Sequence, residues 1–359
     1  MNWERSQNYS LKSKYLAQGL HVSDLTLEDV AKKADVSRST VSRVVNEHPN
    51  VSVDVRKRVQ DVIKNTGYHP HAAARALASQ RSWMIGLVLP RSVSSFFTDP
   101  YFPHLTQGIA YACNQNHYTL SLFLVGTKED EEQIVPRISR RGLLDGIIFQ
   151  SGQMGDKLID RLTSANIPLV VAGRPFRAEG ISYIDVDNIQ ASKIAVEHLI
   201  HLGYKRIGAI TGPRTVGIDR KEGYLRALSE HGIKVDQSLI IEGDFTEASG
   251  YEVMKKLLKA KPDAVFAASD IIAIGAIRAV KEAGLRVPED IAFVGFDDLP
   301  FTSLTDYHLT TVRQPVYQFG VKAVEMLIDL IENGTEPTRH VTLGTEFVVR
   351  DTCGASRRK

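Results

Sequence analysis

From about Trp83 onward, short apolar runs alternate regularly with amphipathic helical stretches, and the alternation occurs twice. A first series runs from "MIGLVLP" to "PLVVAGR", and a second begins after "SYIDVDN" and ends with "IAFVGFDD". Strands that alternate with helices form parallel sheets covered on both faces, so this feature predicts an α/β core of two similar, doubly wound halves. Ligands of such sheets bind beyond the carboxyl ends of the strands, here in a cleft between the halves.

Polar and aromatic side chains gather at those strand ends. The set is Arg174, Asp219, Arg220, Asp244, Phe245, Asp270, Asp297 and Asp298. Carboxylates and a guanidinium group can chelate vicinal hydroxyls, and an aromatic ring can stack on the apolar face of a sugar, so the set favours a polyol ligand. Taken one at a time, Asp219 and Asp270 are equally well explained as helix caps.

The region before residue 70 follows another pattern, with three short helices around a valine-rich core. Thr26 and Asp29 form a capping-box start to the first helix. After a tight turn, Ser37 caps the second helix, and a third over 53–66 is stopped by Gly67. Two helices joined by a tight turn are typical of a helix-turn-helix unit, so we expect an N-terminal all-α helix-turn-helix domain.

The second of these helices carries a polar face opposite its valines. The side chains expected to contact DNA are Ser37, Arg38, Ser39, Thr40, Ser42, Arg43 and Asn46. Arg38 and Ser39 lie near the helix start and are expected to meet base edges, whereas Arg43 can contact guanine or grip a phosphate. Residues 24–82 also hold ten Lys or Arg against seven Asp or Glu, which favours a polyanion. The alternative is an ordinary solvated face.

Residues 71–82 read "HAAARALASQRS", a stretch of high helix propensity that is too short to be stable alone. We interpret it as a helix that forms only when supported, with a flexible linker as the alternative.

Three stretches carry a resemblance to a known family. "LTLEDVAKKADVSRSTVSRVVN", "VSVDVRKRVQDVIKNTGYHPHAAARALASQ" and the remaining chain, from about Leu25 to Thr352, resemble repressors of the LacI/GalR family. The resemblance implies a homodimer whose subunits each place the second helix in one half of a pseudopalindromic DNA operator. It implies that 71–82 is a hinge helix, with Leu77 entering the minor groove and Arg75 near phosphates.

The same resemblance gives the larger part the fold of type I periplasmic sugar-binding proteins. The residues it implies at the effector cleft are Phe102, Arg174, Arg220, Phe245, Asp270 and Asp297. Tyr101 is an alternative to Phe102 as the stacking residue of "DPYFPHL". The "AGRP…YIDVDN" pattern is similar to regulators that answer to glucosides or maltose-type sugars. Purine-responsive relatives instead use their ligand as a corepressor, and the sequence leaves this alternative open.

These patterns divide the chain into an extension (1–24, expected to be disordered), a helix-turn-helix domain (25–70), a hinge helix (71–82) and a core (83–359). Within the core we expect an N-subdomain of about 83–184 plus 314–343 and a C-subdomain of about 185–313 plus 344–359. The final "DTCGASRRK" contains no leucine heptads, so a dimer is expected rather than a dimer of dimers.

The remaining features argue against other classes. No apolar run reaches the length of a membrane span and no signal peptide precedes the first helix, so we expect a cytoplasmic protein rather than a periplasmic sugar carrier. The two cysteines fit no metal spacing, and no metal or cofactor is expected. The nucleotide, phosphate-loop, serine-hydrolase and metalloprotease motifs are missing, so an enzyme is not expected.

Overall fold

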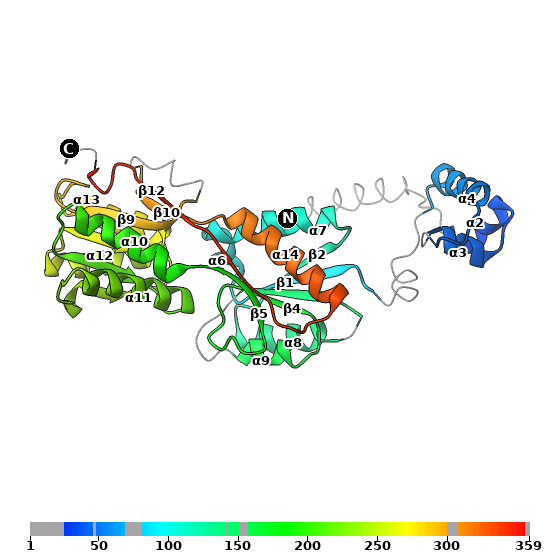
Figure 1. Cartoon of the computed structure of the whole chain (residues 1–359), viewed down its shortest axis with the longest axis horizontal. Helices are drawn as coiled ribbons and strands as arrows, with labels where there is room; N and C mark the ends of the chain where they lie inside the picture. Colours follow the sequence, from blue (N-terminus) through cyan, green and yellow to red (C-terminus); the bar gives the residue numbers. More distant parts are fainter. Residues whose placement is uncertain are drawn as a thin grey trace, which may run out of the picture. The chain divides into compact units, whose positions relative to one another are not determined.

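The computed structural model describes residues 25–45, 48–68, 81–140, 142–150, 157–299 and 308–355. The chain separates into two compact units, Met1–Arg81 and Ser82–Lys359, which are described one at a time (Figure 1). Across the described segments, every helix is too short or too polar to span a lipid bilayer. The extension over 1–24 and the hinge segment up to residue 80 lie outside the described residues.

The smaller unit contains α2 (Leu27–Ala34), α3 (Arg38–Val45) and α4 (Val53–Thr66). The Thr26 hydroxyl accepts a hydrogen bond from the Asp29 amide, and the Asp29 carboxylate accepts one from the Thr26 amide, which completes the predicted capping box. Gly67 ends α4 with a positive φ of 64°. The core joins the valines of all three helices, and Tyr68 closes it from the end of α4. Ser52 occupies the N-cap of α4 without a side-chain hydrogen bond, so backbone geometry alone marks that start.

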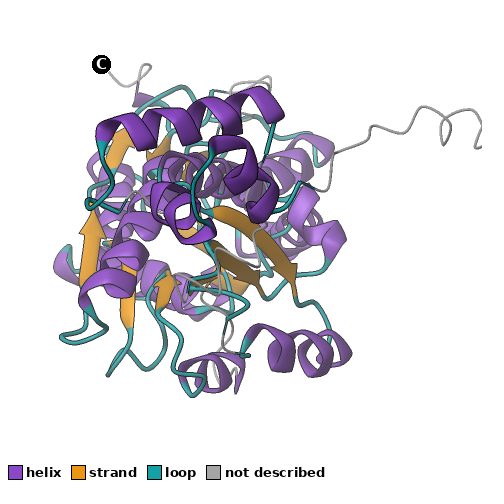
Figure 2. Cartoon of the chain, turned by 90° about the vertical axis from the view of Figure 1, so that its right-hand side faces the viewer, coloured by secondary structure: helices purple, strands orange, loops and turns teal. Residues whose placement is uncertain are grey.

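The first half of the larger unit is built on a six-stranded parallel sheet with the order β11-β5-β4-β3-β1-β2. Its strands are β1 (Met84–Leu89), β2 (Thr119–Leu124), β3 (Gly146–Gln150), β4 (Leu169–Ala172), β5 (Ser182–Val186) and β11 (His340–Leu343). Its helices are α6 (Val93–Thr98), α7 (Tyr101–Gln115), α8 (Lys128–Ile138), α9 (Lys157–Thr163) and α14 (Val316–Asn333). Leu87 packs in the cluster with α7 and α14, whereas Val88 packs with α8 and α9, so the sheet is covered on both faces (Figure 2).

The second half repeats this plan with the strand order β12-β10-β9-β8-β6-β7. Its strands are β6 (Ile207–Thr211), β7 (Ile240–Glu242), β8 (Ala264–Ala267), β9 (Ala292–Asp297), β10 (Thr311–Arg313) and β12 (Glu346–Val348). Its helices are α10 (Asn188–His201), α11 (Thr215–Glu230), α12 (Glu247–Leu257) and α13 (Asp270–Glu282), with 3₁₀ turns η1 (Gln237–Leu239) and η2 (Leu258–Ala260).

One strand differs from the expected parallel arrangement. β12 pairs with β10 in the antiparallel direction, with Val312 opposite Phe347. The chain enters β12 directly from β11 in the other half, so it runs along the sheet edge against the other strands. Antiparallel edge strands are common on parallel sheets of this kind.

The chain passes between the two halves three times, after β5, after β10 and after β11 (Figure 1). Each crossing is only one or two residues long, between Val186 and Asn188, between Arg313 and Val316, and between Leu343 and Glu346. Short parallel crossings of this kind act as a hinge, because a few residues absorb the rotation of one half against the other.

Candidate functional site

The α3 helix presents the polar face that the sequence predicts. Val41 and Val44 are buried, whereas Arg38, Ser39 and Arg43 are exposed. Arg38 lies 3.4 Å from Glu28, but the two side chains are 70% and 62% exposed, so this surface pair contributes little and does not hold the guanidinium back from a ligand.

Local hydrogen bonds at the start of α3 involve three of the predicted hydroxyls. The Ser37 hydroxyl accepts a bond from the Thr40 amide at 3.1 Å and lies 2.8 Å from the hydroxyls of Ser39 and Thr40. Ser37 therefore caps the helix as expected, while Ser42 sits half-buried further along. Asn46, Arg75 and Leu77 lie outside the described residues.

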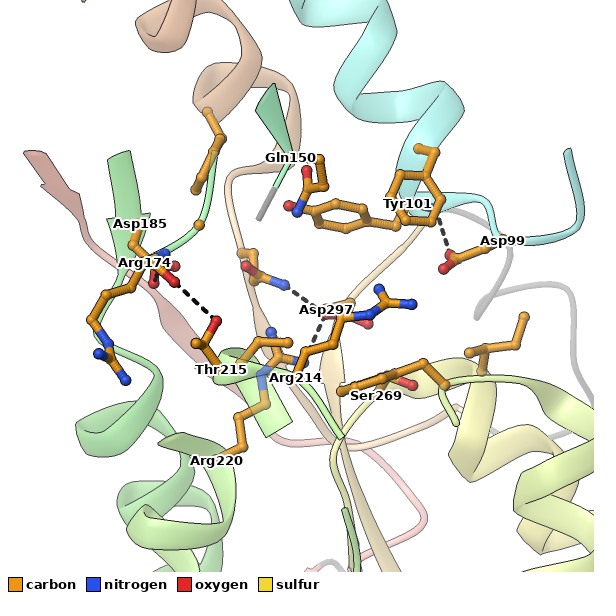
Figure 3. Close-up of a pocket in the computed structure, with 17 residues that line it drawn as sticks. Asp99, Tyr101, Gln150, Arg174, Asp185, Arg214, Thr215, Arg220, Ser269 and Asp297 are labelled. Atoms are coloured by element: carbon orange, nitrogen blue, oxygen red, sulfur yellow. Dashed lines mark hydrogen bonds and ion pairs between the residues drawn. The ribbon is translucent and has the colours of Figure 1, made fainter. Parts of the chain in front are cut away.

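A cavity with about 710 Å³ of space lies between the two halves of the larger unit, where the carboxyl ends of the strands meet (Figure 3). Five of the six residues expected at an effector cleft line it, and they are Phe102, Arg174, Arg220, Phe245 and Asp297. Tyr101 lines it as well, so both candidates for the stacking residue face the cavity.

Arg220 is the best-buried cation of the cleft. Its Nε donates to the Asn188 side chain at 2.9 Å, and its Nη1 donates to the Ala268 carbonyl at 2.5 Å and to Asp297 Oδ1 at 3.3 Å. The guanidinium carbon lies 3.5 Å from the centre of the Phe296 ring, and burial lowers the pKa of the group. Nη2 donates to no atom of the described residues, so a nitrogen of this clamped arginine is left for a ligand.

Asp297, the last residue of β9, is the ionic partner of Arg220 in the cleft. Its Oδ1 accepts hydrogen bonds from Arg220 and from the Gln314 amide, the latter at 2.5 Å (Figure 3). Burial raises its pKa against the opposing effect of Arg220. Asp297 has a φ of 127° and the cleft residue Phe245 has a φ of 65°, conformations that L-residues rarely adopt. Such strained positions cluster at ligand sites, because the strain holds a side chain in one direction.

The aromatic side chains of the cleft pack closely against neighbouring backbone and against each other. A Cβ on Gly212 would overlap the Phe245 ring, so only glycine fits beneath the ring. On the other side of the cleft, the Tyr101 and Phe102 rings meet edge to face with their centres 5.4 Å apart. The two halves therefore each supply apolar ring surface to the same cavity.

Arg174 reaches across the cleft between the halves. Its Nε and Nη2 donate to the two carboxylate oxygens of Asp219 at 2.9 and 2.6 Å. The Thr215 hydroxyl donates to the Arg174 carbonyl at 2.9 Å, and the Arg174 amide donates to Asp185 (Figure 3). Arg174 follows β4, whereas Asp219 lies on α11, so these bonds join the two halves.

Asp270 differs from the expectation, because it does not line the cavity. It is fully buried at the start of α13, where its oxygens accept bonds from the Thr311 hydroxyl at 2.6 Å and the Asp298 amide at 2.7 Å. Burial, followed by the charge of Asp297, raises its pKa to about 7. Asp270 thus supports the strands behind Asp297 from within the protein core.

Several cleft residues were not predicted from the sequence. Asp99 and Asp185 lie on opposite sides of the cavity, and burial raises the pKa of both, to about 6 for Asp99. Gln150 ends β3, and its buried Oε1 accepts no hydrogen bond within the described residues. Asp185 and Gln150 both stand at carboxyl ends of strands, which is a usable signal. Asp99 and Arg214 stand in loops, where only the tertiary fold brings them to the cleft.

A three-helix unit with a polar second helix, followed by a two-half α/β unit with a ligand cleft, defines a ligand-responsive DNA-binding protein. Residues 26–71 match the model of bacterial regulatory proteins of the lacI family, and residues 196–353 match a periplasmic binding protein-like domain.

Curated relatives match over nearly the whole chain. The HTH-type transcriptional regulator CelR of Thermobifida fusca is 35% identical over 332 residues, which are 91% of this chain and 97% of that protein. Catabolite control protein A of Priestia megaterium is 35% identical over 89% of this chain and 96% of its own. The chain therefore belongs to the lacI family, and it is a DNA-binding transcriptional regulator.

Solved structures show the same fold. A CelR–cellobiose complex superposes with a TM-score of 0.73 at 33% identity, covering 91% of this chain and 99% of that one. The lac repressor dimer bound to operator and the anti-inducer ONPF superposes with a TM-score of 0.79 at 27% identity, covering 92% and 99%.

Proposed function

We propose that this regulator is a homodimeric repressor of carbohydrate genes, released from a pseudopalindromic operator when a glucoside or maltose-type saccharide closes the cleft. The observation that carries the proposal is the buried Arg220 guanidinium, which is fixed on three acceptors and a ring while Nη2 is left for a ligand. A fixed fork of donors beside the Asp297 carboxylate matches the alternating donors and acceptors of vicinal hydroxyls.

The walls of the cleft support a carbohydrate. Phe102, Phe245 and Tyr101 supply ring faces, and Asp99 and Asp185 supply acceptor oxygens around them. Mixed aromatic and hydrogen-bonding walls suit a sugar ring, which has apolar faces and a polar rim. The structure of the relative CelR was solved with cellobiose, which adds support from a homologous cleft. We assign this cleft a binding role and no catalytic one.

The DNA-binding end follows from α3. Arg38 and Ser39 are proposed to contact base edges and Arg43 a guanine or a phosphate, with Ser37, Thr40 and Ser42 near the DNA backbone. Asn46, Arg75 and Leu77 complete the proposed set by resemblance. Closing the cleft rotates the halves about the three crossings, and a typical coupling of about 1–3 kcal/mol lowers operator affinity roughly tenfold.

The test is a ligand panel against one DNA probe. A fluorescein-labelled duplex is selected by the purified protein from a random-sequence library, and its affinity is measured by fluorescence anisotropy at fixed salt, because phosphate contacts make affinity salt-dependent. We expect a glucoside or maltose-type disaccharide to weaken binding tenfold or more. If hypoxanthine or guanine tightens binding and no saccharide weakens it, the ligand is a corepressor and the proposal is wrong.

A further inference from the structure

A second cavity, with about 910 Å³ of space, adjoins the effector cleft. Asp99, Phe102, Arg214, Phe245 and Ile271 line both cavities, so the two are continuous. We call the second cavity the outer groove. The residues that line it and not the inner cavity are Arg91, Ser95, Thr98, Asp244, Thr246, Glu247 and Ala248. They come from the β1–α6 region of one half and the β7–α12 region of the other.

Two arginines line the outer groove, Arg91 from one half and Arg214 from the other. The Arg91 guanidinium carbon lies 4.9 Å from the centre of the Phe102 ring, and that of Arg214 lies 5.7 Å from the centre of the Phe245 ring. Each guanidinium therefore lies within cation–π distance of an aromatic ring of its own half. Planar donors beside aromatic surface are suited to a ligand that is also a ring with hydroxyls at its edge.

Neither guanidinium makes a hydrogen bond or ion pair with any described residue, apart from the ring contacts. Arg91 is half-buried, and burial lowers its pKa to about 10. Leaving desolvated donors unpaired is costly, so such donors are rare in folded proteins unless a ligand or water uses them. The position of both donors in a groove that opens into the effector cleft points to the ligand.

The carboxylates of the outer groove limit the charge of that ligand. The Asp244 Oδ1 accepts bonds from the amide and hydroxyl of Thr246, at 3.0 and 2.6 Å, and Glu247 is paired with Arg278. Asp99 and Asp244 thus offset Arg91 and Arg214, so the groove has both donors and acceptors and little net charge. This balance favours a neutral polyhydroxyl group over a phosphate or a carboxylate.

We propose that the outer groove is a subsite for the second and following rings of a linear saccharide, and that Arg91 determines the preference for chains of at least two rings. This inference rests on the proposed function, because it assumes that the first ring occupies the cleft around Arg220. The outer ring lies between the two halves and is held by Arg91 from one and Arg214 from the other. A longer saccharide therefore holds the closed cleft more firmly than a single ring.

The test compares the affinities of one- and two-ring sugars for the full-length protein. Isothermal titration calorimetry with glucose, methyl glucoside, cellobiose, maltose and maltotriose should show at least one two-ring sugar binding tenfold or more tighter than the single rings. Arg91→Met removes the donors and retains the apolar stem. It should lower the affinity for the two-ring sugar about tenfold and leave the affinity for single rings unchanged, because a hydrogen bond to a charged donor contributes about that factor. The matched control is Arg137→Met, an exposed arginine of α8 that lines neither cavity.

The outcomes separate the two proposals. If single rings bind and release the operator but a second ring adds no affinity, the outer-groove inference is wrong and the proposed function stands. The outer-groove inference is also wrong if Arg91→Met lowers the affinity for one- and two-ring sugars by the same factor, or leaves both affinities unchanged. This reading requires that the variant melts at the same temperature as the wild type. If no saccharide binds the wild-type protein, both proposals are wrong.

Discussion

Arg174 and Asp219 join the two halves of the larger unit through a two-pronged ion pair, with the Arg174 Nε and Nη2 donating at 2.9 and 2.6 Å to the two oxygens of one carboxylate. The side chains are 38% and 11% exposed, so the pair is partly screened by water. It connects the chain after β4 to α11 of the other half, so it exists only while the halves are close. It therefore stabilises the closed form relative to an open one.

Arg174→Met should raise the saccharide concentration that half-releases the operator by about fivefold. A partly exposed bidentate pair contributes about 1 kcal/mol, and losing it reduces the closed fraction to which saccharide binds. The measurement is a saccharide titration of protein–operator complex followed by fluorescence anisotropy. Arg177→Met, which changes an exposed arginine three residues later, is the control. A midpoint within twofold of the wild type would show that the ion pair does not hold the cleft closed.

Arg220→Met should abolish the response to saccharide and lower stability. The Arg220 and Asp297 side chains are 4% and 9% exposed, so removing the cation leaves a buried carboxylate without its ionic partner, at a cost of about 3–5 kcal/mol. Operator affinity should remain, because α3 belongs to the other compact unit. Thermal denaturation and operator anisotropy check both points, and Asp297→Asn serves as the companion change that removes the opposite charge. Retention of the full response in Arg220→Met would rule out the assigned role.

The stability of the larger unit should fall as pH rises from about 4 to 7. Burial raises the pKa of Asp270 from its ordinary 3.8 to about 7, so in this range the folded protein holds a proton that the unfolded chain has released. Stability from this group is complete below pH 4 and is lost as pH rises through 7. Asp270→Asn should flatten the decline, and the other buried carboxyls whose pKa is raised, Asp99, Asp185 and Asp297, account for a remainder. Urea unfolding between pH 5 and 8 measures the slope, and an unchanged slope in the variant would contradict this assignment.

Arg38→Ala and Arg43→Ala should both weaken operator binding but in different ways. A base contact costs about 1–3 kcal/mol at one base pair and relaxes the preference there, whereas loss of a phosphate contact reduces the slope of log affinity against log salt by about one. Affinities for the selected operator and its single-base variants, at several salt concentrations, separate the two effects. If both variants bind like the wild type, α3 is not the recognition helix.

The sequence predicts those parts of the fold that depend on local signals. The start of α2 follows from Thr26 and Asp29, and the end of α4 follows from Gly67, because caps are set by neighbouring residues. The positions of Arg174 and Phe245 at the cleft follow from a topological rule about strand ends. Whether these side chains bind a saccharide stays a prediction.

Other features depend on partners far away in the chain. The identity of the Arg174 partner, 45 residues later, is set by how the halves meet and has no sequence pattern. Both Asp270 and Asp297 occur near the carboxyl end of a strand. The Asp270 side chain nevertheless accepts a hydrogen bond from the Thr311 hydroxyl and does not line the cavity. The direction of a side chain at a helix start is a matter of packing, which residue spacing does not encode. The antiparallel course of β12 likewise depends on the crossing from β11.

The central claim is that saccharide binding in the cleft and operator binding oppose each other through one conformational equilibrium. Measuring the coupling between the two ligands in both directions tests this claim most directly. Operator affinity is measured with and without saturating cellobiose or maltose, and affinity for the same sugar is measured for free and operator-bound protein. Linkage requires the two ratios to be equal, and we predict that both are tenfold or more in the direction of mutual exclusion. The claim would be contradicted if neither sugar changed the operator affinity and the operator did not change the sugar affinity. It would also be contradicted if each ligand increased the affinity for the other.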